Sequence, residues 1–276
     1  MKKLLSLFLL VLLAIMPLSA VADTSYPTAN VIVDGAEIVF DQSAVIIQNR
    51  TLVPLRAIFE ALGAFVEWNG EANSVVAKKG NVTITLQIGS NRVYKTTPTM
   101  QDYFDIDVPP QLINSRTLVP VRAISEALEA EVSWNGDTKT VTVISKNKNI
   151  KDHYLTFNNT YLPDDNTSVI LYDIFVAYPQ IEGYEKANES IKKMYENKFE
   201  EIKTKKAEDA KKDYEGSVSY GWTFIPHDYE LLTEVEGIED GKITLISYET
   251  NYTGEVASIK TQTTYVFDLT TGELVK

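Results

Sequence analysis

Apolar side chains recur with a helical period soon after residue 50, in a segment that predicts one short helix between strands. Four of them fall at i, i+3, i+4 and i+7 and form a single stripe: Leu55, Ile58, Phe59 and Leu62. Pro54 suits the first turn of this helix, and Gly63 is placed to end it in a left-handed conformation. Alternating patterns at 31–33 and 38–40, around an Asp34-Gly35 turn, and at 74–77 predict short strands.

The segment that contains this helix is an internal repeat. Residues 50–70 recur 66 positions later as residues 116–136, and roughly 17 of about 30 aligned positions are identical from Arg50 onward. Pro120 begins the second helix. Each helix is followed by a Trp-Asn-Gly turn and then by an alternating strand, which in the second copy lies at 139–144. Glu129 replaces Gly63 in the second copy, which predicts a less favourable helix end.

These patterns predict a β-rich tandem domain over residues 29–145, with one short helix in each repeat. The repeats cover about 29–86 and 92–145. We expect the two units to pack together through their apolar helix faces and their sheets, because neither unit alone buries its apolar stripe.

From residue 146 onward the repeat does not continue. A polar, lysine-rich stretch at 146–152 predicts a linker, and a strand at 168–177 leads into Tyr178-Pro179. Helical spacing over 185–212 predicts an amphipathic helix whose outer face carries charges, and strand-like runs at 217–224, 229–236, 243–252 and 256–267 predict an antiparallel meander. Residues 153–276 therefore form a second domain, in which one long helix packs on an antiparallel sheet. The fold class of the chain is α+β.

The first 22 residues read as a signal peptide. Lys2 and Lys3 precede an apolar run from Leu4 to Leu18, and Ala20-Val21-Ala22 gives a small-x-small cleavage pattern before Asp23. The run is short for a membrane span, which favours a cleaved signal peptide. An uncleaved anchor is the alternative. We expect a secreted, extracellular protein that begins near Asp23 and has no further membrane span.

The composition argues against some classes of partner and excludes some kinds of chemical site. The formal charge is −12, and removal of Lys2 and Lys3 would lower it to −14. Such an acidic surface repels phosphate backbones, so nucleic acid is not expected as a partner. The chain has no cysteine, which excludes disulfides, thiolate metal sites and cysteine nucleophiles.

The tandem segment resembles a known family. Two patterns carry the resemblance: Val31-Ile-Val-Asp-Gly35, and the repeated Arg-Thr-Leu-Val-Pro with the helix and tryptophan that follow it. Over about residues 29–145 they resemble the copper amine oxidase N-terminal-like (stalk) domain. The resemblance implies an accessory module of exported Firmicutes proteins that carries neither copper nor quinone. Amine oxidase activity itself is not expected, because the chain has only His153 and His227, and Thr253 follows Tyr252 where an acidic residue would follow the quinone precursor.

The repeats nominate two pairs of binding residues. Arg56 and Arg122 each precede a glutamate by four positions, which predicts a helix-surface ion pair; the alternative is that they bind an anionic glycan or teichoic acid. Trp68 and Trp134 stand at equivalent strand ends, which favours a core position; the alternative is that they stack on sugar rings.

The second half resembles the domain of unknown function found beside peptidoglycan deacetylase domains and in lysozyme-sensing anti-sigma factors. The resemblance rests on Tyr178-Pro-Gln-Ile181 and on residues 265–273, and it adds Tyr178 as a candidate ligand-binding residue. It implies a wall component, or a basic secreted protein such as lysozyme, as a partner. Relatives usually continue past the last motif, which here ends close to Lys276.

No residue pattern in the sequence predicts catalysis or a cofactor. It contains no Gly-rich phosphate loop, no His-Glu-x-x-His and no Gly-x-Ser-x-Gly. Asp102, Asp105 and Asp107 lack the ligand spacing of a calcium loop, so a solvated turn is the favoured interpretation. The sequence therefore predicts a non-catalytic cell-envelope protein, a stalk or docking module joined to a wall- or protein-recognition domain. The alternatives are a binder or sensor of a lysozyme-type hydrolase and an unrecognised wall hydrolase or deacetylase accessory.

Overall fold

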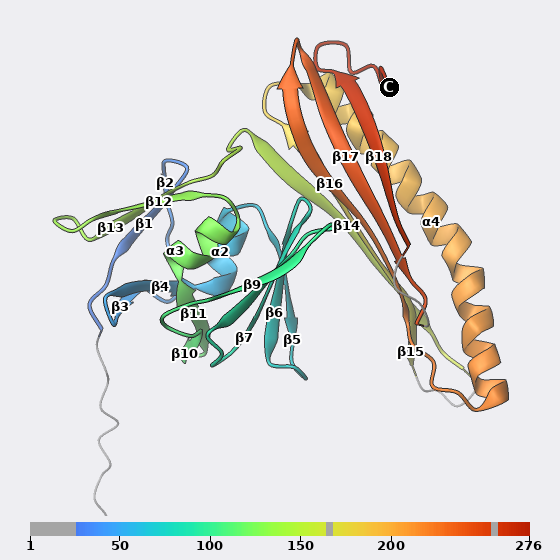
Figure 1. Cartoon of the computed structure of the whole chain (residues 1–276), viewed down its shortest axis with the longest axis horizontal. Coiled ribbons are helices and arrows are strands. Elements are labelled where there is room, and N and C mark those ends of the chain that lie inside the picture. Colours follow the sequence, from blue (N-terminus) through green and yellow to red (C-terminus); the bar gives the residue numbers. More distant parts are fainter. Residues whose placement is uncertain (1–25, 164–167, 255–258) are drawn as a thin grey trace, which may run out of the picture.

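The tandem domain contains three small sheets around two short helices (Figure 1). The structure is a computed structural model, and it describes residues 26–163, 168–254 and 259–276; the predicted signal segment 1–22 lies outside them. Helix α2 (Leu55–Ala61) buries Leu55, Ile58 and Phe59, as the apolar stripe predicts, and helix α3 (Val121–Ala127) packs against it. The strands are β1 (Asn30–Val33), β2 (Ala36–Glu37), β3 (Val45–Ile47), β4 (Arg50–Pro54), β5 (Phe65–Asn69), β6 (Ser74–Lys79), β7 (Val82–Gln87), β8 (Arg92–Thr96), β9 (Gln101–Asp105), β10 (Gln111–Ile113), β11 (Arg116–Pro120), β12 (Glu131–Asn135) and β13 (Thr140–Ile144).

The two repeats exchange strands as well as packing their helices together. Strand β1 pairs in parallel with β13, with Asn30 opposite Thr140, and β4 pairs antiparallel with β11. The sheets therefore have the orders β12-β13-β1-β2, β10-β11-β4-β3 and β5-β6-β7-β8-β9, and each of them contains strands of both repeats. One core cluster contains buried side chains of all three sheets, among them Val31, Val53 and Val75, so the repeats form one interlocked body.

The second domain is one five-stranded sheet covered by one long helix. Its elements are β14 (Ile150–Tyr161), β15 (Val169–Ile181), α4 (Glu185–Tyr220), β16 (His227–Glu239), β17 (Lys242–Tyr252) and β18 (Ile259–Asp268), and the sheet runs in that strand order. The α+β class is confirmed. The sheet is not wholly antiparallel, because β15 and β16 run parallel and α4 is the crossover connection that joins them.

Three predictions for this region need correction. The predicted strand at 217–224 is wrong, because α4 continues to Tyr220 and Gly221 ends it with a φ of 73°. The helix is consequently longer than the predicted 185–212. The polar connection between the domains ends at Asn149, because β14, which the sequence pattern did not indicate, begins at Ile150.

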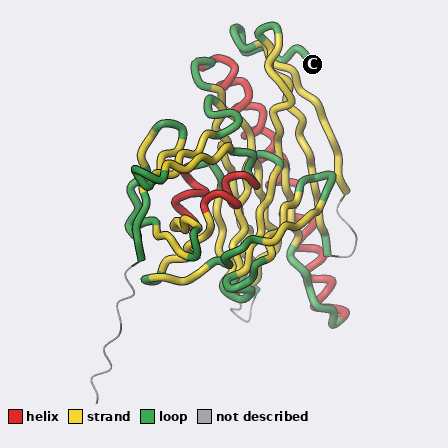
Figure 2. The backbone as a smooth tube through the Cα atoms, turned by 60° about the vertical axis from the view of Figure 1, so that its left-hand side comes forward, coloured by secondary structure: helices red, strands yellow, loops and turns green. Residues whose placement is uncertain are grey.

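The faces of the second sheet have different neighbours. Along β15, Ile174 and Val176 share the α4-side core, whereas Phe175 and Ala177 lie in a separate cluster with Phe65 of the tandem domain. This division follows from the alternation of side chains along a strand. Helix α4 therefore covers one face, and the tandem domain meets the other, as Figures 1 and 2 show from two sides.

Aromatic rings and polar contacts join the two domains. The Phe65 ring lies 5.5 Å from that of Tyr154 and 5.2 Å from that of Phe175. The Tyr154 hydroxyl donates to the Gly63 carbonyl at 2.5 Å. Lys78 forms a 2.6 Å ion pair with Glu230 and lies over the Phe175 ring. The tandem domain is thereby seated on the sheet by specific side chains rather than joined only through a linker.

The end of the chain packs against the start of α4. Gly272 has a φ of 77°, and a Cβ built on it would lie 2.5 Å from the backbone oxygen of Lys186. Only glycine fits a position that combines this conformation with so close an approach of two backbones. The glycine of the final motif is therefore explained by the packing of its turn on the helix.

Candidate functional site: twin grooves on the tandem domain

A pseudo-twofold axis relates the two repeats. In the pairing of β4 with β11, Val53 lies opposite Val119, and the pairs on either side are Leu52 with Pro120 and Pro54 with Leu118. Because equivalent residues differ by 66 in number, the pairing is unchanged when the repeats are interchanged. The axis therefore passes between Val53 and Val119.

Ion pairs cross this axis in both directions. Arg50, at the start of β4, pairs with Asp107, and the equivalent Arg116 pairs with Asp41 at 2.7 Å. The hydrogen bond from Arg116 lowers the pKa of the Asp41 carboxyl below its ordinary value. Each arginine follows a two-residue turn with positive φ, at 48–49 and 114–115, as in the tight hairpins that reverse a strand directly.

Two grooves are related by the same axis, and we name each after its tryptophan. The Trp68 groove has a volume of about 680 Å³ and the Trp134 groove about 530 Å³. Each lining residue of the first has a counterpart 66 positions away in the second. The Trp68 groove is lined by Val39, Phe40, Asp41, Pro54, Leu55, Arg56, Ala57, Glu60, Val66, Glu67, Trp68, Val75, Ser115, Arg116 and Thr117.

Both grooves are composite. Asp41, Arg56 and Trp68 come from the first repeat, but Arg116 of the same groove comes from the second. In the Trp134 groove the contributions are reversed, with Arg50 supplied by the first repeat. Neither repeat alone therefore builds a groove, and the exchange of strands is what brings the lining residues together.

The tryptophans stand at the rims of the grooves. Trp68 pairs across the β5–β6 hairpin with the buried Val75, so both side chains project from the face that meets α2. The short helix does not extend over the hairpin end, and Trp68 is 48% exposed and Trp134 43% exposed. The favoured interpretation of both tryptophans as core residues is therefore wrong.

The two helix arginines differ in their contacts. Arg122 pairs with Glu126 at 3.3 Å, as its spacing predicts, and also donates to the Val132 carbonyl at 2.8 Å. Among the described residues, Arg56 forms no ion pair with Glu60 or with any other acidic group. Both arginines are exposed and line their grooves, so the structure brings Arg56 together with Trp68 and Arg122 together with Trp134.

Tyr178 is not part of either groove. It is 2% exposed, and its ring stacks on Tyr195 of α4 at 5.3 Å between centroids. Burial raises the pKa of its hydroxyl. The prediction of Tyr178 as a ligand-binding residue is wrong, because its motif forms the end of β15 and supplies the helix-side core.

Sequence reasoning missed the crossing pairs as site residues. Arg50 and Arg116 lie inside the repeat, and Asp41 and Asp107 are also 66 residues apart, which is a usable signal. The sequence pattern groups Asp107 only with Asp102 and Asp105, as a calcium cluster or a solvated turn. Asp105 pairs with Arg92 at 3.3 Å, and over the described residues no group of three His, Cys, Asp or Glu side chains is arranged to hold a metal ion.

No helix in the described part of the chain combines the length and apolar character needed to cross a membrane.

Comparisons with known proteins agree with the repeat. The sequence matches the family described as the copper amine oxidase N-terminal domain at residues 32–143 and again at 99–174. A Brevibacillus choshinensis protein named "Protease inhibitor" is 34% identical over 135 residues, which are 47% of this chain and 39% of that protein. This chain thus spans about two fifths of the length of that relative.

One solved structure is similar over part of the chain. It is a member of the DUF3298 family from Bacteroides fragilis, 13% identical, with a TM-score of 0.32 over 46% of this chain and 59% of that one. A TM-score this low does not establish a shared fold. The two family matches, in contrast, together run from residue 32 to residue 174, just over half of the sequence. The chain belongs to the copper amine oxidase N-terminal domain family.

Proposed function

We propose that this protein is a non-catalytic binding module of the cell envelope, whose twin grooves hold a repeating wall polymer. The observation that carries the proposal is the pair of equivalent grooves, each with a tryptophan at its rim beside arginine and carboxylate groups. An exposed indole offers a flat apolar face, and the polar groups beside it fix the orientation of a ligand. Two equivalent grooves suit a ligand that presents the same unit more than once.

The groups that line the Trp134 groove favour binding over reaction. In the Trp134 groove, Asp107 and Glu126 are each held by an arginine, so neither is poised as a general acid or base. The two histidines of the chain lie elsewhere: His153 stacks on Tyr178, and His227 is buried beside Asp213. The predicted signal peptide at 1–22 supports an exported location for such a module.

Co-sedimentation with purified peptidoglycan sacculi tests this function. We expect residues 23–276 to pellet with sacculi, and the double substitution Trp68→Ala/Trp134→Ala to leave the protein in the supernatant. Trp222→Ala is the matched control, because Trp222 is 65% exposed on the other domain and lies in neither groove. Equal pelleting of the double variant and the unsubstituted protein would remove the grooves from wall binding.

A protein partner is a second candidate, supported by a separate observation. Tyr220 and Trp222 stack on each other at 5.1 Å, and both are exposed at the end of α4. Exposed aromatic side chains of this kind often anchor protein interfaces, and a relative carries the name "Protease inhibitor". The formal charge of −12 favours a basic partner, such as a lysozyme-type hydrolase.

Titration calorimetry with lysozyme and with a basic secreted protease at low salt tests this candidate. Here Trp222→Ala is the disruptive variant and Trp68→Ala/Trp134→Ala is the control, the reverse of the sacculus experiment. Heat of binding that disappears only in Trp222→Ala supports a protein-recognition surface on α4. Absence of heat with both proteins argues against it.

A further inference from the structure

Every charged side chain that lines the Trp134 groove takes part in an ion pair. Arg50 pairs with Asp107, Arg122 with Glu126, and Asp105 with Arg92 beside the groove. Every charged residue that lines this groove is included in those pairs. The groove therefore offers many hydrogen-bonding atoms but neither a spare cation nor a spare anion.

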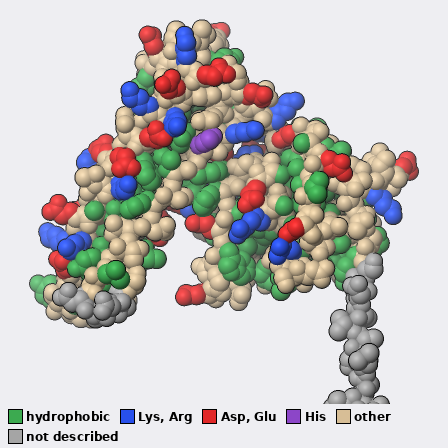
Figure 3. Space-filling model, turned by 180° about the vertical axis from the view of Figure 1, so that it is seen from behind, with side chains coloured by type: hydrophobic (Ala, Val, Ile, Leu, Met, Phe, Trp, Pro, Cys, Tyr) green, Lys and Arg blue, Asp and Glu red, His purple; other side chains and the backbone are tan. Residues whose placement is uncertain are grey.

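The Trp68 groove is similar, with a slight acidic excess. Asp41 is paired with Arg116, and the remaining charged residues are Arg56, Glu60 and Glu67. The single unpaired arginine is thus accompanied by two carboxylates. Over the visible surface, acidic and basic side chains are interspersed rather than gathered by sign (Figure 3). Neither of these two grooves presents the excess of cations that a polyanion requires.

From this balance we infer that each groove binds an uncharged sugar ring of a glycan strand, of the N-acetylated amino-sugar type. This inference rests on the proposed function and names its ligand class. The flat face of the ring stacks on Trp68 or Trp134, and its hydroxyl and acetamido groups bond to the crossing Arg–Asp pairs. Paired guanidinium and carboxylate groups keep donors and acceptors free for such contacts.

The same balance argues against the charged alternatives. An anionic wall polymer of the teichoic acid type needs spare guanidinium groups, and in the Trp134 groove both arginines already hold carboxylates. A cationic amino sugar needs a spare carboxylate beside the indole, and in the Trp134 groove the carboxylates are already paired. In the Trp68 groove Glu60 and Glu67 are accompanied by the guanidinium of Arg56. Binding of a neutral ring requires no ion pair to be broken.

The small number of tryptophans allows each groove to be observed separately. The chain has three: Trp68, Trp134 and Trp222. In a Trp222→Phe background each groove holds one of the two remaining fluorophores. A further Trp68→Phe or Trp134→Phe substitution leaves a single reporter while retaining an aromatic ring in the silent groove.

The experiment titrates these variants with three soluble probes: an N-acetylglucosamine tetramer, its de-N-acetylated counterpart and a polyglycerol phosphate. We expect the N-acetylated tetramer to shift the emission of both reporters, with an affinity that does not change with salt. Arg116→Gln in the Trp68 groove, or Arg50→Gln in the Trp134 groove, should weaken binding of the tetramer to that groove about tenfold. Calorimetry of Trp68→Ala and Trp134→Ala should show a loss of affinity of similar size. A response only to polyglycerol phosphate that fades with salt, or only to the cationic oligomer, overturns the inference.

Failure of this inference is distinguishable from failure of the proposed function. If sacculi bind in a tryptophan-dependent way but the neutral tetramer gives no response, the envelope module stands and the ligand class is wrong. If the sacculi and all three probes fail, both proposals fall. Circular dichroism of each variant confirms that the loss is not one of folding.

Discussion

Equivalent residues in the two repeats adopt the same backbone conformation even where their side chains differ. Gly63 and Glu129 both follow a helix, with φ of 80° and 63°. Glycine enters this left-handed region freely, whereas a residue with a Cβ does so at a cost of roughly 1–2 kcal/mol. The second helix end is therefore strained, as the sequence predicts, and its one visible compensation is the 2.7 Å ion pair from Glu129 to Lys146.

We predict that Glu129→Gly raises the free energy of unfolding of the tandem domain by about 1 kcal/mol, since an exposed ion pair contributes little in return. Gly63→Ala should lower it by about 1–2 kcal/mol through φ alone, because no atom lies within 4 Å of the Cβ position. Urea unfolding measures both. A loss of stability in Glu129→Gly would mean that the bond to Lys146 outweighs the backbone strain.

The site residues divide by how far apart in sequence their partners lie. Trp68 and Arg56 belong to one local unit, so the repeat alone was enough to nominate them, but it could not show that the helix stops short of the hairpin end. The bond between Arg50 and Asp107 joins residues 57 positions apart. It exists only because strands are exchanged across the pseudo-twofold axis, and no local pattern encodes that exchange.

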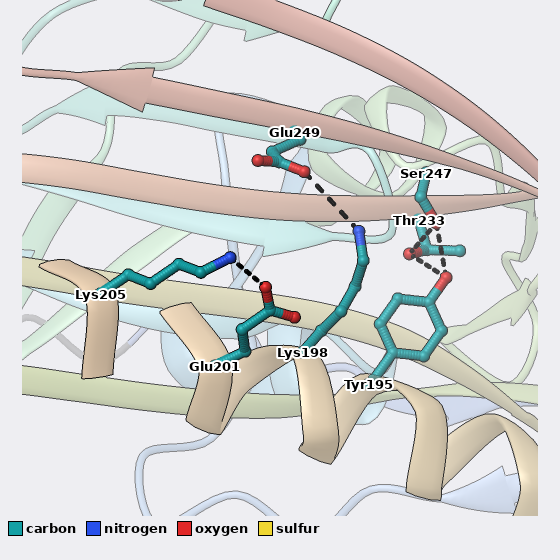
Figure 4. Close-up of polar contacts among 7 residues, drawn as sticks. All are labelled: Tyr195, Lys198, Glu201, Lys205, Thr233, Ser247 and Glu249. Atoms are coloured by element: carbon teal, nitrogen blue, oxygen red, sulfur yellow. Dashed lines mark hydrogen bonds and ion pairs between the residues drawn. The ribbon is translucent and has the colours of Figure 1, made fainter. Parts of the chain in front are cut away.

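At the scale of elements, α4 is attached to its sheet by both apolar and polar contacts. Beneath the helix, the Tyr195 hydroxyl lies 2.5 Å from Ser247 and accepts a hydrogen bond of 2.9 Å from Thr233 (Figure 4). Lys198 reaches Glu249 of the sheet at 3.6 Å in the same view. Burial raises the pKa of Tyr195 to about 12, so the hydroxyl stays protonated and available to this network.

Removal of this hydroxyl should destabilise the second domain. We expect Tyr195→Phe to lower its free energy of unfolding by about 1–3 kcal/mol, because Thr233 and Ser247 lose a buried partner. Tyr220→Phe is the control, since that ring is exposed at the end of the same helix and should change nothing. Thermal unfolding followed by near-ultraviolet circular dichroism makes the comparison, and equal midpoints for both variants would refute the role of the network.

The elements that sequence analysis misjudged share a physical cause. The last turns of α4 face the sheet with small or polar residues at helical spacing, Ala207, Ala210, Tyr214 and Ser217, so no strong apolar stripe marks them. Strand β14 is an edge strand whose polar residues are frequent, and its partner β15 supplies most of the buried side chains. Long periodic segments were predicted correctly, whereas edges and small-residue faces were not.

At the scale of the whole molecule, the tandem domain is fixed to the second domain by residues that break its own symmetry. Phe65 enters the interdomain aromatic cluster, and its counterpart in the other repeat is the exposed Glu131. Likewise Lys78, bonded to Glu230, corresponds to Ile144. One side of a nearly symmetric body has thus been adapted to hold a partner domain.

We predict that Phe65→Glu releases the domains from one another, because it places a charge among Tyr154 and Phe175. Small-angle scattering should show a larger radius of gyration, while circular dichroism of the folded domains is retained. Glu131→Phe alters the equivalent exposed position and serves as the control with unchanged dimensions. An unaltered scattering curve for Phe65→Glu would show that the remaining contacts hold the domains together.

The interface also carries a pH dependence. Asp152 accepts a hydrogen bond from the Gly80 amide and faces Lys79, yet burial raises its pKa to about 6 from an ordinary value of 3.8. Since the folded state binds this proton more tightly, the stabilising contribution is complete below about pH 4 and is lost as the pH rises through about 6. Asp152→Asn should therefore gain thermal stability relative to the unsubstituted protein between pH 5 and pH 7. If the thermal midpoints of the two proteins changed with pH in the same way across that range, the raised pKa of Asp152 would be contradicted.

The pairing of β1 with β13 has a consequence for how the protein is made. A ribosome completes β1 long before β13, since their paired residues Asn30 and Thr140 are separated by most of the tandem domain. The nascent first repeat must therefore wait with an unpaired strand edge and an exposed apolar surface until the second repeat emerges. The tandem domain can therefore complete its fold only after the second repeat has been synthesised.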